Sequence, residues 1–249
     1  VVDKNQKVVG IITNRDVRFA KNNNQAISEL MTKSNLITAK EGISQKNALN
    51  ILHDKKVEKL IIIDSEYKCV GLITVTDIEK SQKYPLATKD GIGSLRVAAA
   101  IGVGKDGIER AFGLVKAGVD AIVLDTAHGH SERVIKTIRE LKKSFKDNVQ
   151  IIAGNIATAA AAKCLAKEDV DGIKVGIGPC SICTTRVIAG VGVPQFSAIR
   201  EIHEAIKKTS IPIIADGGIR YSGDVAKAIG AGADSVMIGS LLAGTEESP

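Results

Sequence analysis

The sequence predicts an α/β protein: a parallel (β/α)8 barrel, of which about six strand–helix units are present, with a second module ahead of them. Three observations lead to this fold. An internal repeat occupies residues 1–78, short apolar runs alternate with amphipathic stretches after residue 96, and the last two runs end in small residues. With 249 residues, 44% of them hydrophobic, the chain is long enough to bury a sizeable core.

The internal repeat relates residues 1–17 to residues 62–78 at an offset of 61 positions. Each copy predicts a short strand, a turn, a second strand ending in Thr, and a helix with Asp in its first turn. Only the second copy has its front half, residues 36–60, so we expect the first copy to be cut before residue 1. The matching pairs are Asp3/Asp64, Lys7/Lys68, Gly10/Gly71, Thr13/Thr74 and Asp16/Asp77.

This repeat resembles a tandem CBS pair, a regulatory module that often binds adenine nucleotides between its two copies. The resemblance implies that Thr13, Asp16, Thr74 and Asp77 face the ribose and phosphates of an adenine or guanine nucleotide. The alternative is that each Thr and Asp only caps the helix that follows. We expect residues 1–34 to hold the end of the first CBS motif and a connector, and residues 35–82 to hold the second motif.

A linker over residues 83–96 leads to the expected barrel segment, residues 97–249. Its apolar runs are predicted to be parallel strands, because helical stretches separate them. The runs are 97–101, 121–125, 150–154, 172–176, 211–216 and 235–239.

The last two apolar runs end in "ADGGI" and "IGS", whose backbone N–H groups could cradle a phosphate. In (β/α)8 barrels the phosphate site commonly follows strands 7 and 8. We therefore number the six runs as strands 3 to 8. We then expect the CBS pair to be an insertion into a TIM barrel after its second strand, and this chain to be a fragment that lacks both ends of the barrel.

Composition excludes several classes of partner. The net charge of +6 is spread without a basic run or interleaved aromatic residues, so no nucleic-acid partner is expected. No apolar stretch approaches the roughly 20 residues of a membrane span. The four cysteines are not the dense framework of a secreted protein, which favours a reducing, cytoplasmic setting.

Cys180 and Cys183 stand three positions apart in "GIGPCSICTTR". A redox pair usually opens a helix, whereas the residues that follow predict a long loop before a helix near Ser197. A zinc site that adds His128 and His130 lacks the second close-spaced ligand pair. We therefore expect Cys183 to be a single nucleophile at the C-terminal side of a barrel strand.

Residues 102–107, "GVGKDG", match the dinucleotide fingerprint G-x-G-x-x-G, with Asp125 downstream. A Rossmann fold must therefore be considered. We expect a barrel instead, because small and polar residues follow the strands all along the segment and the fingerprint is short.

Several longer motifs carry a family resemblance that covers essentially the whole chain. "GIGP.SICTTR..AGVGVPQ", "LDTAHGHS", "AGNIAT", "ADGGIR" and "MIGSLLAGTEESP", with a CBS pair upstream, resemble the bacterial IMP dehydrogenases. The resemblance implies a homotetramer that oxidises IMP to XMP with NAD, the committed step of guanine nucleotide synthesis. It implies that Cys183 forms a covalent adduct with C2 of the purine ring and that Thr185 helps position the water that releases the product.

The same resemblance assigns the ligand sites. Asp216 would bind the ribose hydroxyls of IMP, and the purine and nicotinamide region would be lined by Asp125, Asn155 and Gly176. The phosphate would be held by Ser181, Gly218, Gly239 and Ser240. A potassium ion (K+) would be bound by backbone carbonyls at Gly178, Cys180 and Cys183.

Cys180 departs from the family pattern, which has Gly at this position. If the position needs a positive φ, a Cβ there costs about 1–2 kcal/mol and disturbs an ion site made of carbonyls. The second thiol also allows oxidative coupling to Cys183, which would switch the enzyme off reversibly.

Three rival functions remain. GMP reductase shares the cysteine loop but uses NADPH, normally lacks the CBS pair and does not have "DTAHGH". A flavin-dependent TIM-barrel oxidase would not need the nucleophile. A catalytically silent CBS sensor of adenine nucleotides would bind ligand without chemistry at Cys183. The family's mobile flap is expected beyond Pro249, so we expect this fragment alone to be inactive.

Overall fold

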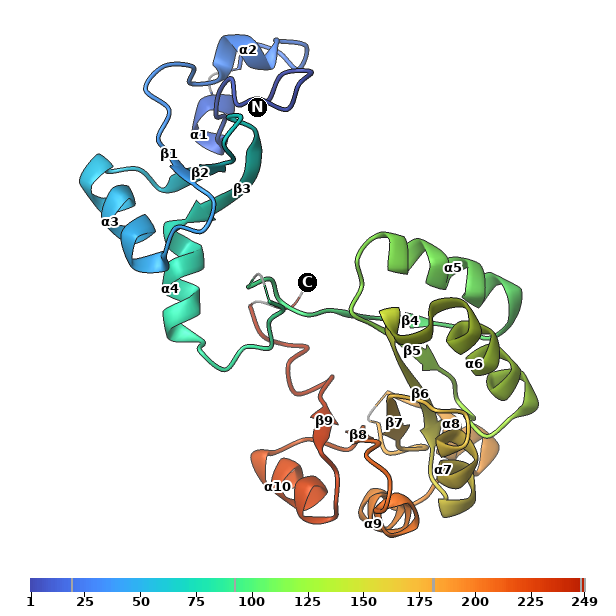
Figure 1. Cartoon of the computed structure of the whole chain (residues 1–249). Helices are drawn as coiled ribbons and strands as arrows, with labels where there is room; N and C mark the ends of the chain where they lie inside the picture. Colours follow the sequence, from blue (N-terminus) through green and yellow to red (C-terminus); the bar gives the residue numbers. More distant parts are fainter. Residues whose placement is uncertain (19, 92, 181, 247, 249) are drawn as a thin grey trace. The chain divides into compact units, whose positions relative to one another are not determined.

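A computed structural model describes residues 1–18, 20–91, 93–180, 182–246 and 248. The chain divides into two compact units, Val1–Thr88 and Lys89–Pro249 (Figure 1). No helix in the described ranges is both long enough and apolar enough to cross a lipid bilayer.

The first unit is built on a three-stranded sheet in the order β1–β2–β3. Strand β1 (Thr38–Lys40) is parallel to β2 (Lys59–Ile63), which is antiparallel to β3 (Cys69–Thr74). Helix α3 (Gln45–Lys55) and helix α4 (Val75–Lys83) pack on this sheet through a small apolar core. Its buried residues are Ala48, Leu52, Leu60, Ile62 and Ile78.

The second copy of the repeat folds as predicted, with two strands, β2 and β3, and then α4, whose first turn carries Asp77. The first copy differs. Its described residues form only isolated bridges, such as Val2 with Val8, before the short helices α1 (Asn14–Val17) and α2 (Ile27–Leu30). Strand β2 has a partner on each side, whereas the described part of the first copy has no such central strand. Its ladder therefore does not extend.

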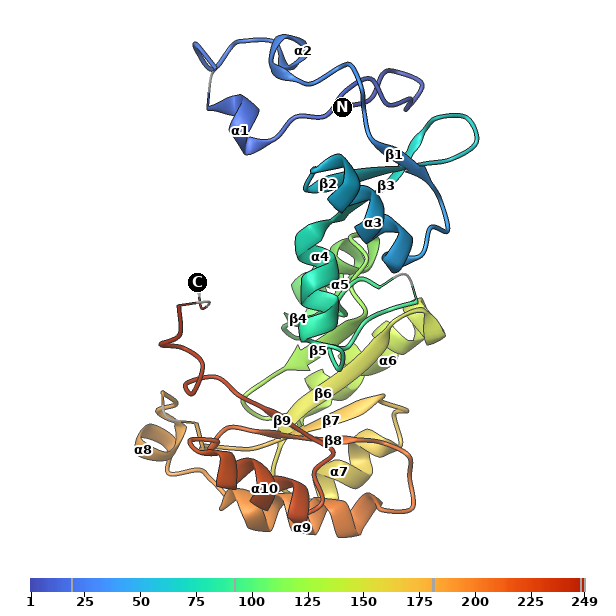
Figure 2. The same cartoon turned by 90° about the vertical axis from the view of Figure 1, so that its left-hand side faces the viewer.

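The second unit contains a curled sheet of six parallel strands in sequential order, β4 to β9 (Figure 2). Each predicted strand is confirmed to within two residues at either end. The sequential order differs from the doubly wound order of a Rossmann sheet and fits a partial (β/α)8 barrel. The strands are β4 (Ala98–Ile101), β5 (Ala121–Asp125), β6 (Gln150–Ile156), β7 (Gly172–Val175), β8 (Ile213–Asp216) and β9 (Ser235–Met237).

Helices cover the outer side of this sheet (Figure 1). Helix α6 shows why: its residues at helical spacing, Val134, Ile138, Leu141 and Phe145, are buried in the core that the strands and helices share. The covering helices are α5 (Gly104–Lys116), α6 (Glu132–Phe145), α7 (Ala159–Ala166), α9 (Gln195–Ile206) and α10 (Ser222–Gly230). The short helix α8 (Thr185–Ala189) buries no residue, and a 3-10 turn spans Lys146–Asn148.

Two sequence patterns find a structural explanation here. The glycines of "GVGKDG" pack the start of α5 onto the end of β4, because a Cβ at Gly107 would overlap the carbonyl of Gly102. The long loop predicted after Cys183 is partly wrong, since α8 interrupts it and ends at Gly190 in the left-handed conformation. Arg186 of α8 anchors the rest of the loop with a 2.9 Å bond to the carbonyl of Val193.

An ion pair ties α6 to the turn after α7. The Arg139 guanidinium donates two hydrogen bonds of 2.7 Å to the Glu168 carboxylate, and this pairing lowers the pKa of Glu168. The stabilisation is therefore complete above the ordinary carboxyl pKa of about 4.3 and disappears as the pH falls through the lowered value.

We expect Glu168→Gln to lower the melting temperature at neutral pH and to match the wild type in strong acid, as followed by circular dichroism. Glu140→Gln removes an exposed carboxylate from α6 and serves as the control. A melting-temperature difference for Glu168→Gln that is the same at neutral and strongly acidic pH would contradict the assignment.

Candidate active site

The C-terminal ends of the parallel strands bring four polar side chains to one edge of the sheet. Asp125 ends β5, Asn155 lies near the end of β6, Lys174 lies on β7 and Asp216 ends β8. Parallel strands share one carboxyl edge, which is where barrel enzymes build their sites. Three of these residues were predicted from the sequence, and Lys174 was not.

Lys174 is the centre of this group. Its Nζ lies 2.6 Å from Oδ2 of Asp216 and 3.1 Å from Oδ2 of Asp125, and the residue is only 2% exposed. Its neighbours Ile173 and Val175 belong to the core under the helices, so Lys174 points to the opposite face of β7. A buried ammonium needs such partners, and it fixes both carboxylates in return. The overlooked signal was a lone charge inside the apolar run "GIKVG".

Asn155 adds hydrogen bonds to the same carboxylate. Its Nδ2 donates to Oδ2 of Asp216 and to the carbonyl of Gly176, both at 2.8 Å. Its backbone is held by Thr126, because the Asn155 N–H donates to the Thr126 carbonyl at 2.8 Å. Oδ1 of Asn155 is buried and has no partner among the described residues. This oxygen is an acceptor available to a ligand.

Gly176 and Gln195 hold the ends of β7 and β8 close together. A Cβ at Gly176 would overlap the carbonyl oxygen of Asp216, so glycine is required there. Nε2 of Gln195, at the start of α9, donates to the carbonyls of Val175 (2.8 Å) and Asp216 (3.2 Å). Gln195 was not predicted from the sequence, because a glutamine that follows "VP" is as typical of an ordinary helix start as of a site residue. Its buried Oε1 also lacks a partner within the described ranges.

The loop after β7 that carries Cys180 and Cys183, called the cysteine loop, lies over the turn that follows Asp216. Gly217 and Gly218 have φ of +86° and +78°, and a Cβ at Gly217 would come within 3.0 Å of Pro179 and 3.1 Å of the Cys180 nitrogen. The "DGG" turn therefore needs glycine both for its conformation and for space. Packing on this turn positions the loop beside the carboxylate cluster.

Cys180 and Cys183 are joined by a disulfide, with their Cα atoms 5.4 Å apart. Cys183 is exposed and Cys180 is partly buried. Cys180 is not among the described non-glycine residues with positive φ, so the strain considered for a Cβ at this position does not arise. Thr185 begins α8, two residues after Cys183.

Gly218 and Gly239, two of the residues predicted to bind the phosphate, follow the neighbouring strands β8 and β9 at equivalent positions. Asp216 pairs with Met237, so Gly218 and Gly239 each follow a paired position by two residues. The N–H groups of Gly218, Gly239 and Ser240 donate no hydrogen bond within the part of the chain that is described. Three amides are thus available to an anion. Ser181, also predicted to hold the phosphate, lies outside the described residues.

The carbonyls predicted to bind K+ accept no hydrogen bond from a described residue. They belong to Gly178, whose φ is +81°, and to Cys180 and Cys183. His128 and His130 are exposed, with ring centroids 6.5 Å apart. In the described ranges, no three His, Cys, Asp or Glu side chains gather closely enough to hold a metal ion.

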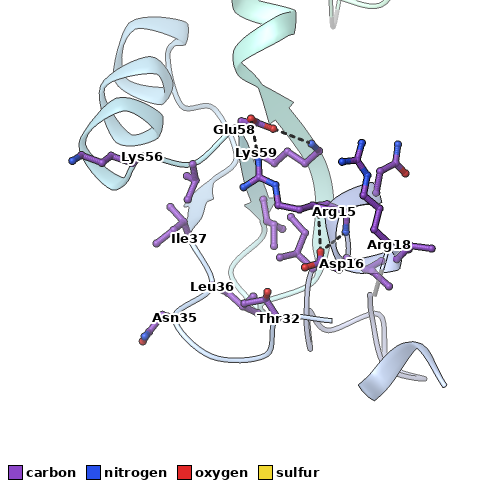
Figure 3. A pocket seen from close by; sticks show the side chains of 17 residues that line it. Arg15, Asp16, Arg18, Thr32, Asn35, Leu36, Ile37, Lys56, Glu58 and Lys59 are labelled. Atoms are coloured by element: carbon purple, nitrogen blue, oxygen red, sulfur yellow. Dashed lines mark hydrogen bonds and ion pairs between the residues drawn. The ribbon is translucent and has the colours of Figure 1, made fainter. Parts of the chain in front are cut away.

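The first unit has a separate cavity of about 890 Å³, a size typical of ligand pockets. It is lined by residues 11–18, by Thr32 and by residues between 35 and 61, ahead of the repeated residues 62–78, and Figure 3 shows Glu58 between Arg15 and Lys59. The Glu58 carboxylate lies 3.5 Å from Arg15 and 3.9 Å from Lys59. The four cations that line the cavity are Arg15, Arg18, Lys56 and Lys59.

Thr13 and Asp16 line this cavity, whereas Thr74 and Asp77 do not. The Asp16 carboxylate accepts hydrogen bonds of 2.7 Å from the hydroxyl and the N–H of Thr13, which lower the pKa of Asp16. The Thr74 hydroxyl bonds Asp77 in the same way at 2.7 Å and caps α4. Both Thr–Asp pairs therefore have the geometry of a helix capping box, the first on α1 and the second on α4.

The sequence and structure match known proteins over the whole chain. A family profile described as "IMP dehydrogenase / GMP reductase domain" matches residues 31–249. Proteins named inosine-5'-monophosphate dehydrogenase from Rhizobium tropici and Escherichia coli K12 are 57% and 53% identical. Both alignments cover all of this chain, and the chain spans about half the length of these curated relatives, 50% and 51%.

Solved structures of GMP reductase from Trypanosoma brucei are also similar. The one in complex with guanosine 5'-monophosphate is 41% identical with a TM-score of 0.83, and the match covers 99% of this chain and 52% of that chain. The one in complex with guanosine 5'-triphosphate is 42% identical, also with a TM-score of 0.83. Since these reductases match 99% of the chain, the presence of the first unit does not separate the two activities.

The substitution Lys174→Met tests the central position of Lys174, because it keeps the length of the side chain and removes its charge. The Asp216 and Asp125 carboxylates then lose their cation. We expect the free energy of unfolding to fall by about 1–3 kcal/mol, less than for a fully buried pair because Asp125 is half-exposed. Urea denaturation measures the loss.

Lys136→Met is the matched control, since the Lys136 side chain is 73% exposed and the change should stay within about 0.5 kcal/mol. Equal losses in the two variants would show that Lys174 does not hold the cluster together.

Proposed function

The chain belongs to the IMP dehydrogenase / GMP reductase family, and from this premise we propose that it forms part of an NAD-dependent enzyme that oxidises IMP to XMP. The observation that carries the proposal is the cysteine loop seated on the Gly217–Gly218 turn beside the Lys174, Asp125, Asp216 and Asn155 cluster. A nucleophile next to groups suited to a ribose phosphate fits attack on a purine nucleotide.

Cys183 is the proposed nucleophile. In the reduced protein its thiolate adds to C2 of the hypoxanthine ring and forms a C–S bond. NAD, when bound, accepts the hydride that leaves C2. Water then attacks C2, the C–S bond breaks with its electron pair returning to sulfur, and XMP is released. Thr185, two residues from Cys183 at the start of α8, is proposed to help position that water.

The proposed substrate contacts follow from charge. Asp216 accepts hydrogen bonds from the neutral ribose diol, a role that suits a carboxylate whose charge is compensated by Lys174. The amides of Gly218, Gly239 and Ser240 are available to the phosphate, and Ser181 is proposed to join them. Because Asp216 and the amides recognise different parts of the nucleotide, the carboxylate does not repel the phosphate.

The residues proposed for NAD and K+ fit these groups. Asp125, Asn155 and Gly176 would line the purine and nicotinamide region, and the unpartnered Oδ1 of Asn155 is a suitable acceptor for an amide N–H. The carbonyls of Gly178, Cys180 and Cys183 would bind K+, because hard monovalent cations take oxygen ligands and described donors leave these oxygens unoccupied.

We further propose that the first unit is a CBS pair that binds an adenine or guanine nucleotide. Two observations support this proposal: four cations that suit phosphates line the cavity, and so do Thr13 and Asp16, which are proposed to bind the ribose. Thr74 and Asp77 are proposed to join them only if α4 moves, since these two residues do not line the cavity. A cytoplasmic location and a homotetramer complete the proposal.

GMP reductase is the competing function, because the Trypanosoma brucei reductases share this architecture. Sequence identity favours the dehydrogenase: the two relatives of that name reported above are 57% and 53% identical, against 41–42% for the reductases. A silent CBS sensor would bind nucleotide without turnover.

The full-length gene product that contains this chain, reduced with dithiothreitol, is expected to form NADH from IMP and NAD, and faster with K+. Cys183→Ser should lower the rate about 1000-fold or more, because a hydroxyl is a poor nucleophile. Cys164→Ser changes a free cysteine of α7 and is the control. Absorbance of NADH measures the rate. Consumption of NADPH with GMP, and no NADH from IMP, would instead identify the reductase.

For the first unit, Arg18→Gln should weaken the binding of ATP or GTP about tenfold, because one phosphate contact is lost. Lys46→Gln removes one charge from α3, outside the cavity, and should leave binding unchanged. Fluorescence titration with labelled nucleotides measures both. Equal affinities for the two variants would contradict a nucleotide site in this cavity.

A further inference from the structure

We propose that Cys180 is the resolving thiol of a reversible oxidation site, through which a peroxide converts Cys183 into the Cys180–Cys183 disulfide and stops turnover. The proposal rests on the proposed function, in which Cys183 is the nucleophile. It adds a modification site and the chemical class of its oxidant.

The geometry of the loop supports this site. The Cα atoms of Cys180 and Cys183 are 5.4 Å apart, within the range over which a disulfide closes without backbone movement. Cys183 is exposed, so a small oxidant reaches its sulfur from solvent. The other two cysteines, Cys69 and Cys164, are free, so the pairing is confined to this loop.

Packing keeps Cys180 close to the nucleophile. Pro179 and the Cys180 nitrogen lie against the Gly217 turn, which fixes the start of the loop. At the other end, the Arg186 guanidinium donates a hydrogen bond to the carbonyl of Val193. The Arg186 side chain also packs on Gly178, where a Cβ would lie only 2.6 Å from it. The segment between these anchors contains both sulfurs. A thiol held this close resolves an oxidised partner faster than a thiol from solution does.

The chemistry balances with hydrogen peroxide as the oxidant. The Cys183 thiolate attacks one peroxide oxygen, the O–O bond breaks, and Cys183 sulfenic acid and hydroxide form. The Cys180 thiolate then attacks the Cys183 sulfur and displaces hydroxide, and protonation gives water. The two thiols are oxidised by two electrons and the peroxide is reduced to two waters. A dithiol reductant reverses the step by thiol–disulfide exchange.

The disulfide removes the Cys183 thiolate and leaves the Lys174 cluster untouched, because none of the described contacts of Lys174, Asp216 and Asn155 involves either cysteine sulfur. Oxidation should therefore abolish turnover more completely than it weakens the binding of IMP.

The test oxidises the reduced full-length gene product with hydrogen peroxide and then adds dithiothreitol. NADH formation from IMP should fall about tenfold or more and return with the reductant. Trypsin cleaves after Lys174 and after Arg186, and so releases residues 175–186 as one peptide that contains both cysteines. After oxidation this peptide should be lighter by two hydrogen atoms and resist alkylation.

Cys180→Ser is the decisive variant, compared with its own starting activity. Without the resolving thiol, Cys183 should pass from sulfenic to sulfinic acid and the lost activity should not return. Cys164→Ser should behave as the wild type.

Two results would overturn the inference: a peptide that remains fully open to alkylation after peroxide, or full recovery of Cys180→Ser. Failure of the proposed function is distinguishable, because the reduced protein would then form no NADH from IMP while the peptide mass still reports the pairing.

Discussion

The buried ammonium of Lys174 is the interaction on which the rest of the site depends. It lies between the ends of β5 and β8, and it makes the close approach of Asp125 and Asp216 electrostatically acceptable. Once Asp216 is fixed, the amide of Asn155 can bond it, and Gln195 can bond its carbonyl. These contacts link four strands, β5 to β8, and helix α9, so the site and the curvature of the sheet are parts of one arrangement.

The cysteine loop depends on a second constraint, the absence of side chains on the turn after β8. Gly217 and Gly218 let Pro179 and Cys180 approach the end of the strand, and Gly176 does the same for the carbonyl of Asp216. These glycines make room so that a loop with few contacts of its own acquires a defined position. Cys183, the proposed nucleophile, follows this contact by three residues and is itself exposed.

The strands were predictable because each is an apolar run bounded by helical stretches, and strand ends were predictable from the acids and glycines that follow them. Lys174 was not, because a periodicity argument treats a charge within a strand as an interruption, and only the folded sheet shows two carboxylates facing it. Helix α8 was not predicted, because it is only five residues long and lies in a glycine-rich segment that is typical of a loop. The strands predicted for the first copy do not form because they have no central strand to pair with, and a local sequence pattern cannot show whether such a partner is present.

The cluster also explains why one chain resembles both dehydrogenases and reductases. Under the proposed function, Asp216 and the amides at Gly218 and Gly239 meet the ribose and phosphate, which IMP and GMP have in common. The thiolate of Cys183 meets C2, which both purines also present. The two activities therefore differ in what happens after the C–S bond forms, and that outcome depends on whether water or hydride reaches C2. Under the same proposal Thr185, at the start of α8, helps position the water, so we expect the choice between the two reactions to depend on residues near it rather than on the Lys174 cluster.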